Sequence, residues 1–153
     1  MSLFVRLADW HTDRNAIRGI RQKVFVEEQN VPPELEWDEL EETAQHFLVY
    51  HDSKAIGTGR LTGGGKIGRM AIQREARGHG AGLELLRRIC KFAGLSGQKN
   101  VYLNAQVHAI PFYEKAGFVP VGDEFMEAAI PHVRMERTLN DSEPSENLDD
   151  WNR

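Results

Sequence analysis

The chain has 153 residues, of which 41% are hydrophobic and one is a cysteine. This length fits one globular domain that buries its own core, and the lone Cys90 excludes an intrachain disulfide. No apolar stretch reaches about 18 residues, and the N-terminal segment lacks the apolar run of a signal peptide. We therefore expect no membrane span and a cytoplasmic location.

The net charge of −4 is unevenly distributed along the chain. Residues 140–153 hold five acids against one arginine and little to bury, which predicts a disordered acidic tail after a domain of residues 1–139. The domain is neutral, which argues against nucleic acid as a partner. Within it, residues 24–45 contain eight acids and no Lys or Arg, whereas residues 54–91 contain nine basic and two acidic residues. These segments are either solvated surface or separate sites for a cation and an anion.

The first third of the chain predicts one strand and one long helix. Apolar residues alternate over residues 3–7, as in a half-buried strand. Thr12 or Asp13 is the expected N-cap of an amphipathic helix that reaches about Glu28. Because a Pro-Pro pair follows, residues 29–43 are expected to form a loop or a short broken helix that carries most of the acids.

The rest of the chain predicts strands that alternate with two helices. One expected strand starts at Phe47. The others span residues 55–61, 66–72, 101–105, 118–121 and 132–139. One amphipathic helix follows the glycines around residue 80, and a shorter one over residues 110–116 ends at Gly117. This order predicts an α/β (α+β) fold in which helices pack on a mixed sheet.

The sequence RGHGAG, residues 77–82, lies between a predicted strand and a predicted helix. Closely spaced glycines let backbone N–H groups point at a ligand, and the helix N-terminus adds positive potential, so the segment predicts an anion site suited to a diphosphate. It is not a dinucleotide fingerprint, because Leu83 stands where the third glycine would be, and Gly65-Lys66 is no P-loop, because Ile67 follows. The alternative interpretation is a flexible surface turn.

The cysteine and the histidines give little sign of chemistry. Cys90 lies on the apolar face of its helix and is interpreted as an inert core thiol, which argues against an acyl-cysteine. No H-E-x-x-H motif occurs, and His46 and His51 would face opposite sides of one strand, so no metal is expected. His132, at the start of the last strand, either packs there or lines a site.

Two motifs stand in the order and at the separation found in one known family. Residues 77–82 match Arg/Gln-x-x-Gly-x-Gly/Ala, and residues 103–118 contain LNAQ followed by PFYEKAGF. Further matches are VFVEEQ (24–29), Asp38, His46 and IPH (130–132). Over residues 1–139 the chain resembles the GNAT acetyltransferases, in particular their ElaA-like branch. The resemblance implies a mixed twisted sheet of about six to seven strands, flanked by about four helices, with the fourth and fifth strands splayed apart.

The resemblance also implies that acetyl-CoA is the acyl donor and where it binds. Backbone groups of residues 70–72 would pair with the pantetheine chain, and N–H groups of residues 77–83 would hold the pyrophosphate. Asn104 would contact the cofactor and Tyr113 would meet the thioester sulfur. The cofactor-binding residues implied are Met70, Ala71, Ile72, Arg77, Gly78, His79, Gly80, Ala81, Gly82, Leu83, Asn104, Phe112 and Tyr113.

The expected reaction is direct transfer of acetyl from acetyl-CoA to a primary amine. Tyr113 would protonate the leaving thiolate, unless its ring is only a core aromatic, and Glu28 or His132 would deprotonate the amine or line the acceptor site. The acidic segment suits a small cationic molecule, a protein lysine or a protein N-terminus. The alternative is a non-catalytic acyl-CoA-binding sensor on the same fold. No metal, nucleic acid or membrane partner is expected, and a homodimer is left open.

Overall fold

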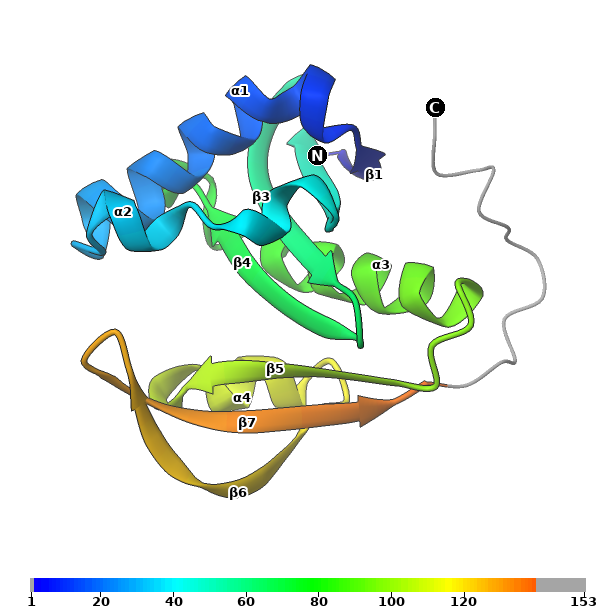
Figure 1. The fold of residues 1–153 in the computed structure, drawn as a ribbon. Helices are drawn as coiled ribbons and strands as arrows, with labels where there is room; N and C mark the ends of the chain where they lie inside the picture. The colour runs from blue at the N-terminus through cyan, green and yellow to red at the C-terminus, as the bar shows by residue number, and fades with distance from the viewer. Residues whose placement is uncertain (1, 140–153) are drawn as a thin grey trace.

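One twisted sheet with helices on both faces organises the chain (Figure 1). The computed structural model describes residues 2–139, and the predicted tail, residues 140–153, lies outside the described residues. The strands are β1 (Leu3–Ala8), β2 (Gln45–His51), β3 (Lys54–Thr62), β4 (Lys66–Ile72), β5 (Asn100–Gln106), β6 (Val119–Glu127) and β7 (Ile130–Thr138). The helices are α1 (Trp10–Arg21), η1 (Gln22–Glu28), α2 (Pro33–Glu36), η2 (Glu39–Glu42), η3 (Arg74–Ala76), α3 (Ala81–Leu95), η4 (Val107–Ala109) and α4 (Ile110–Glu114).

The strand order is β1-β2-β3-β4-β5-β7-β6, a seven-stranded sheet within the described residues. β4 and β5 are parallel, and the other neighbouring strands are antiparallel. The expected mixed sheet of about six to seven strands is thus confirmed. In the part of the chain that the structure describes, no helix is long and apolar enough to cross a membrane.

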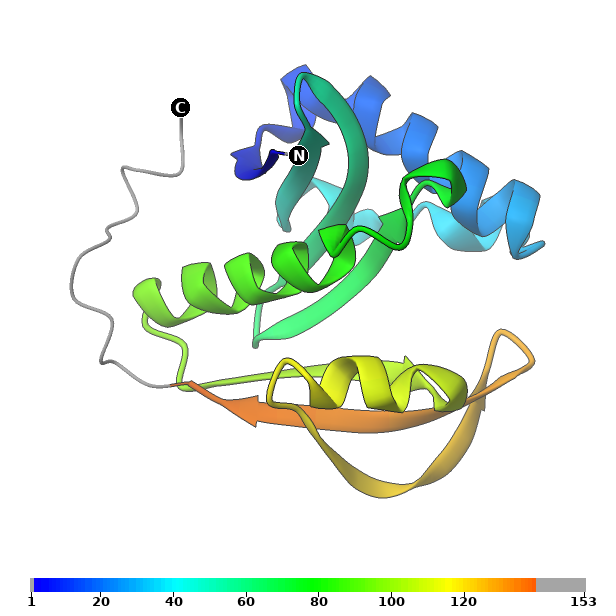
Figure 2. The same ribbon diagram turned by 180° about the vertical axis from the view of Figure 1, so that it is seen from behind.

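Separate apolar clusters cover the two faces of the sheet. α1 lies on one face, and α3 and α4 lie on the other, as the view from behind shows (Figure 2). Leu85 and Ile89 of α3 share one cluster with Phe47, whereas Ile17 of α1 shares the other with Leu48. Neighbouring residues of β2 therefore serve opposite faces, and the strand is an unbroken apolar run because it is covered on both sides.

The first helix begins earlier than expected and widens at its C-terminal end. Asp9 is the N-cap, because its carboxylate accepts from the N–H groups of His11 and Thr12 at 2.9 and 3.1 Å. The expectation of Thr12 or Asp13 was wrong, since Asp13 instead pairs with Arg6 at 2.8 Å. From residue 22 the helix continues as the π-helix η1, a form that often occurs at functional sites.

The acids of the 24–45 segment that are buried face arginines of the same domain. Arg21, which is 1% exposed, donates to Glu36 at 2.6 Å and to Glu41 at 2.7 Å. Arg60 reaches Asp38 at 2.8 Å and Glu41 at 2.9 Å. Burial opposes ionisation of Glu41, but the hydrogen bonds from both arginines outweigh it and lower the pKa of Glu41. The segment thus folds as a buried ion network.

β4 and β5 diverge after a single pair of bridged residues. Their only paired positions among the described residues are Lys66 and Tyr102, where the Tyr102 N–H also donates to the Gly65 carbonyl at 2.9 Å. β4 stays joined to β3 along its length, with a bulge where Arg69 has φ of +50°. The splay expected from the resemblance is thereby confirmed, and it opens a wedge in the middle of the sheet (Figure 1).

The strand expected at residues 118–121 is longer, because β6 extends to Glu127. It passes a bulge that contains Gly122 at φ +84° and turns into β7 through Ala128 and Ala129 at φ +52° and +61°. Two left-handed residues form the turn that suits a tight hairpin, but the usual residues are Asn and Gly. Two alanines give no turn signal, so the sequence did not indicate this hairpin.

We predict that Arg21→Met destabilises the domain by about 3–5 kcal/mol, because it leaves the buried carboxylates of Glu36 and Glu41 without their main cation. The free energy of unfolding from urea titration is the measurement. Arg87→Met is the control, since Arg87 is exposed on α3 and its loss should change stability by less than about 0.5 kcal/mol. A loss of under 1 kcal/mol in Arg21→Met would contradict the importance of the network.

Candidate functional site

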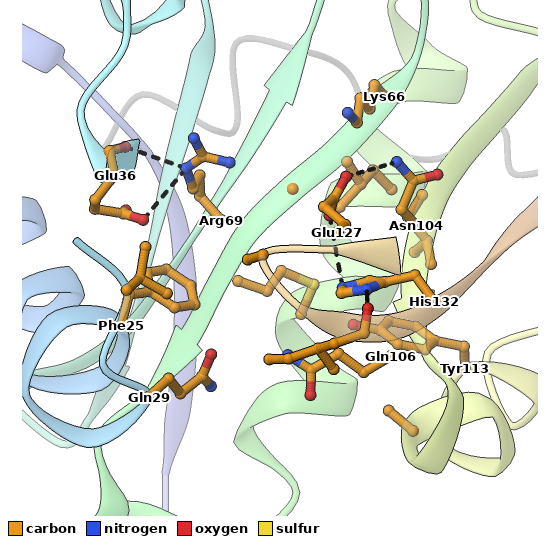
Figure 3. Close-up of a pocket in the computed structure, with 18 residues that line it drawn as sticks. Phe25, Gln29, Glu36, Lys66, Arg69, Asn104, Gln106, Tyr113, Glu127 and His132 are labelled. Carbon is orange, nitrogen blue, oxygen red and sulfur yellow. Dashed lines mark hydrogen bonds and ion pairs between the residues drawn. The ribbon is translucent and has the colours of Figure 1, made fainter. Parts of the chain in front are cut away.

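The wedge between β4 and β5 holds a cavity of about 530 Å³ (Figure 3). β4 and β5 form its floor and one side, η1 and α2 contribute a second wall, and α4 and the β6–β7 hairpin contribute the third. The polar and aromatic side chains that line it include Glu36, Lys66, Arg69, Asn104, Tyr113, Glu127 and His132. Segments far apart in the sequence thus converge on one space.

Beyond Lys66, no described strand covers the edge of β4 that faces the wedge, although the carbonyl of Ile72 accepts from the Arg77 side chain. Residues 71 and 72 pair with β3 on one side, and no described strand pairs with them on the other. An extended ligand can therefore hydrogen-bond to this edge as an added strand would. Of the predicted residues here, the Met70 side chain lines the cavity, whereas Ala71 is 3% exposed and offers its backbone alone.

The 77–83 segment has the geometry that an anion requires. Gly78 and Gly80 have φ of +86° and +83°, a conformation that side chains disfavour, and Gly80 is the N-cap of α3. Within the described residues no side chain caps this helix, so its first N–H groups stay free for a ligand. Phe112 packs on the loop from α4, since a Cβ at Gly82 would lie 3.3 Å from its ring. A diphosphate fits these groups.

The Arg77 side chain and Glu28 bind each other. The guanidinium donates to both carboxylate oxygens of Glu28 at 2.7 and 2.8 Å, and its Nε donates to the carbonyl of Ile72 at 2.9 Å. These bonds join the glycine loop, the end of β4 and η1. The hydrogen bonds from Arg77 hold the pKa of Glu28 below its ordinary value, which makes this carboxylate a weaker base. Glu28 is also absent from the cavity wall.

Tyr113 and His132, by contrast, lie together in the cavity (Figure 3). The Tyr113 ring packs edge-on against Phe112 and Phe118, and burial raises the pKa of its hydroxyl, which keeps the proton in place. His132 is 6% exposed and stacks on Phe125. A tyrosine that retains its proton and a histidine that can accept one therefore share one wall.

The hydrogen bonds of His132 fix which nitrogen faces the cavity. Its Nδ1 donates to the carbonyl of Ile130 at 2.7 Å, and because a carbonyl only accepts, this nitrogen carries a proton. Its Nε2 lies 3.5 Å from a carboxylate oxygen of Glu127. The other oxygen of Glu127 accepts from the Asn104 amide at 3.3 Å. Asn104, His132 and Glu127 thus form one polar chain across the wall.

Cys90 lies away from this wall, in the core cluster under α3. Burial raises the pKa of its thiol from 9.0 to about 11, against a smaller opposing effect of Arg137. Such a thiol is a poor nucleophile at neutral pH. Among the described residues no group of three or more His, Cys, Asp or Glu could hold a metal ion.

Comparison with known proteins decides the family. Residues 11–139 match the acetyltransferase (GNAT) domain. The chain belongs to the GNAT acetyltransferases. YjcF of Bacillus subtilis, described as an uncharacterized N-acetyltransferase, is 41% identical over 120 residues, which cover 76% of this chain and 86% of YjcF. ElaA of Escherichia coli is 31% identical over 132 residues, which cover 81% of this chain and 86% of ElaA.

Solved structures of GNAT proteins share the fold. The crystal structure of Escherichia coli ElaA has a TM-score of 0.77 at 26% identity and covers 89% of this chain and 98% of its own. A GNAT acetyltransferase of Elizabethkingia anophelis with acetyl-CoA bound has a TM-score of 0.68 at 14% identity and covers 90% and 98%. The first likeness, with the sequence relative, supports the ElaA-like branch within the GNAT family. The second shows the fold alone.

Sequence reasoning did not single out several polar residues of this cavity, among them Lys66, Gln106 and Glu127. Gln106 could have been found, because it alternates with Asn104 on β5 and so shares its face. Lys66 opens a predicted strand, a place that carries no chemical signal. The position of Glu127 is set by the turn at Ala128 and Ala129, and no sequence signal indicated that turn.

We predict that Glu28→Gln weakens CoA binding about three- to tenfold, because it removes the charge that ties Arg77 and the glycine loop to η1. At saturating substrates kcat should stay within about twofold. Calorimetry with CoA and steady-state kinetics measure the two effects, and Glu27→Gln is the control on the exposed neighbouring position. If kcat instead fell about a hundredfold with unchanged CoA affinity, Glu28 would be the base.

We also predict that Cys90 is not needed for turnover. Because its thiol pKa is raised from 9.0 to about 11, labelling by an aromatic disulfide at pH 8 should be at least about 100-fold slower in the folded than in the unfolded protein. Cys90→Ala, assayed well below its melting temperature, should keep kcat within about twofold. Loss of activity in a folded Cys90→Ala protein would restore the acyl-cysteine alternative.

Proposed function

We propose that this protein transfers the acetyl group of acetyl-CoA directly to a primary amine. The observation that carries the proposal is that Tyr113 and His132 both line a cavity along the edge of β4 that no described strand covers. Membership of the GNAT family supports an acetyltransferase reaction. The free N–H groups at the start of α3 and the backbone edge of β4 suit the diphosphate and the amide-containing arm of CoA.

Bound acetyl-CoA supplies the thioester that the amine attacks. An ammonium group has no lone pair, so a base must first remove a proton. His132 suits this step, because its Nδ1 proton is fixed on a carbonyl and its Nε2 is the nitrogen left to accept. Glu127, 3.5 Å from Nε2, stabilises the imidazolium that results.

Tyr113 acts at the leaving group. Because burial raises the pKa of its hydroxyl, Tyr113 keeps its proton at neutral pH and has one to donate. The hydroxyl would donate a hydrogen bond, and then the proton, to the departing sulfur as negative charge develops there, where the same apolar surroundings also disfavour a free thiolate. A backbone N–H on the open edge of β4 polarises the thioester carbonyl at the same time. The sequence left Glu28 and His132 open as the base. We assign this role to His132, whereas Glu28 holds Arg77 of the glycine loop.

The test is steady-state release of CoA thiol with accepted amines, beside CoA titration of the same proteins. We expect Tyr113→Phe and His132→Gln each to lower kcat about a hundredfold, the lower end for acid–base groups, and to change CoA affinity less than threefold. His51→Gln, at an exposed position on β2, is the control. Unchanged kcat in both variants would overturn the mechanism.

Turnover by the wild-type protein tests the function itself. If the protein binds CoA and acetyl-CoA but releases no thiol with any amine in a broad panel, the proposal fails. The non-catalytic acyl-CoA sensor would then be the better description.

A further inference from the structure

The charged side chains of the cavity have been assigned partners with one exception. Glu36 is bound by Arg21 at 2.6 Å, and its side chain is 4% exposed. Arg69 lies 3.2 Å from Asp38 and 3.5 Å from Glu36. Glu127 accepts from Asn104 and lies 3.5 Å from His132, so its charge has a cationic partner only when His132 is protonated. The Lys66 ammonium has no ion-pair partner among the described residues, although its side chain lines the cavity and is half-buried.

The acids of residues 24–45 do not favour a cationic acceptor once their partners are known. That expectation depended on the acids of residues 24–45, but the buried ones are neutralised by Arg21, Arg60 and Arg69. Glu28, in the same segment, is paired with Arg77. The acidic segment therefore brings no free negative charge to the cavity wall, whereas β4 brings a free positive one.

Lys66 lies at the closed end of the wedge, where β4 meets Tyr102 of β5 (Figure 3). Tyr102 is covered by the Arg134 guanidinium, 3.9 Å from its ring centre, and Arg134 is paired with Glu136 at 2.9 Å. Arg134, the cation next to Lys66, therefore already has an anionic partner in Glu136. A half-buried ammonium without a counterion can bind a ligand anion through charge-assisted hydrogen bonds.

We infer that the acceptor carries a carboxylate besides its amine and that Lys66 binds this carboxylate. The inference rests on the proposed function, because it requires the amine to react at Tyr113 and His132. Lys66 stands four residues before Met70 on β4, about 13 Å along an extended strand. Because Lys66 and His132 line the same cavity, a molecule with an amine at one end and a carboxylate at the other can place the amine near His132 while the carboxylate meets Lys66.

The experiment compares acceptors that differ only in the carboxylate. Each amino acid is assayed beside its carboxamide and its decarboxylated amine, and a short peptide with a free C-terminus tests whether the carboxylate comes from a peptide or from a free small molecule. With the wild-type protein we expect kcat/KM to be at least tenfold higher for the carboxylated member of a pair. Release of CoA thiol is the readout.

Variants of Lys66 assign the preference to this side chain. Lys66→Gln should raise KM at least tenfold for the carboxylated acceptor, leave KM of its carboxamide within about threefold, and leave CoA affinity unchanged. Lys66→Glu should reverse the preference toward amines that carry a second cation. Lys54→Gln, at an exposed position on β3, is the control.

Two outcomes would overturn the inference without touching the proposed function. One is equal kcat/KM for carboxylated and uncharged amines with the wild-type protein. The other is an equal rise of KM for both acceptors in Lys66→Gln. If no acceptor of any charge releases thiol although CoA binds, the proposed function itself fails, so the two failures are distinguishable.

Discussion

The geometry of the cavity depends on the divergence of two neighbouring parallel strands, which lose their hydrogen bonds after one bridged pair. β4 and β5 meet at Lys66 and Tyr102 and then separate. A sheet interior normally leaves no backbone group unpaired, so this divergence would be costly if nothing filled it. The gap forms the cavity, and the edge of β4 and side chains of β5 and β7 line it. A closed sheet of the same strands would have no cavity.

The ion network keeps the other wall of that gap in place. Glu36 on α2 and Glu41 on η2 are tied to Arg21 on α1, and Asp38 is tied to Arg60 on β3. Segments with few apolar contacts of their own are thereby fixed to the sheet. Arg69 joins the network from the bulge of β4, where its left-handed backbone turns the side chain toward Asp38. The bulge and the network therefore support one another beside the cavity.

Much of the fold and part of the candidate site could be predicted from the sequence. The strand positions follow from alternation and apolar runs, and the glycine loop follows from three glycines before an amphipathic helix. The resemblance to a family supplied the splay and located Tyr113 and His132. These features depend on local patterns, which one chain displays without its partners.

What the sequence did not indicate depends on contacts between distant segments. The acids of residues 24–45 read as a binding surface, because their arginine partners lie elsewhere in the chain and pairing is visible only after folding. The helix is capped at Asp9, and Asp13 binds Arg6 of β1 and the Asp9 N–H instead of acting as the N-cap. The turn at Ala128 and Ala129 carries a left-handed backbone that costs each alanine about 1–2 kcal/mol, so it persists only because the strands on either side pair.

The single bridged pair between β4 and β5 also has a mechanical consequence. It makes the sheet two panels, β1 to β4 and β5 to β7, that share few backbone bonds along their seam. In the proposed function, the arm of CoA lies along the open edge and supplies bonds where the neighbouring strand does not. Bound donor would then stabilise the junction between the two parts of the sheet, and release of free CoA would remove that stabilisation. The local stability of the junction would therefore change within each catalytic cycle.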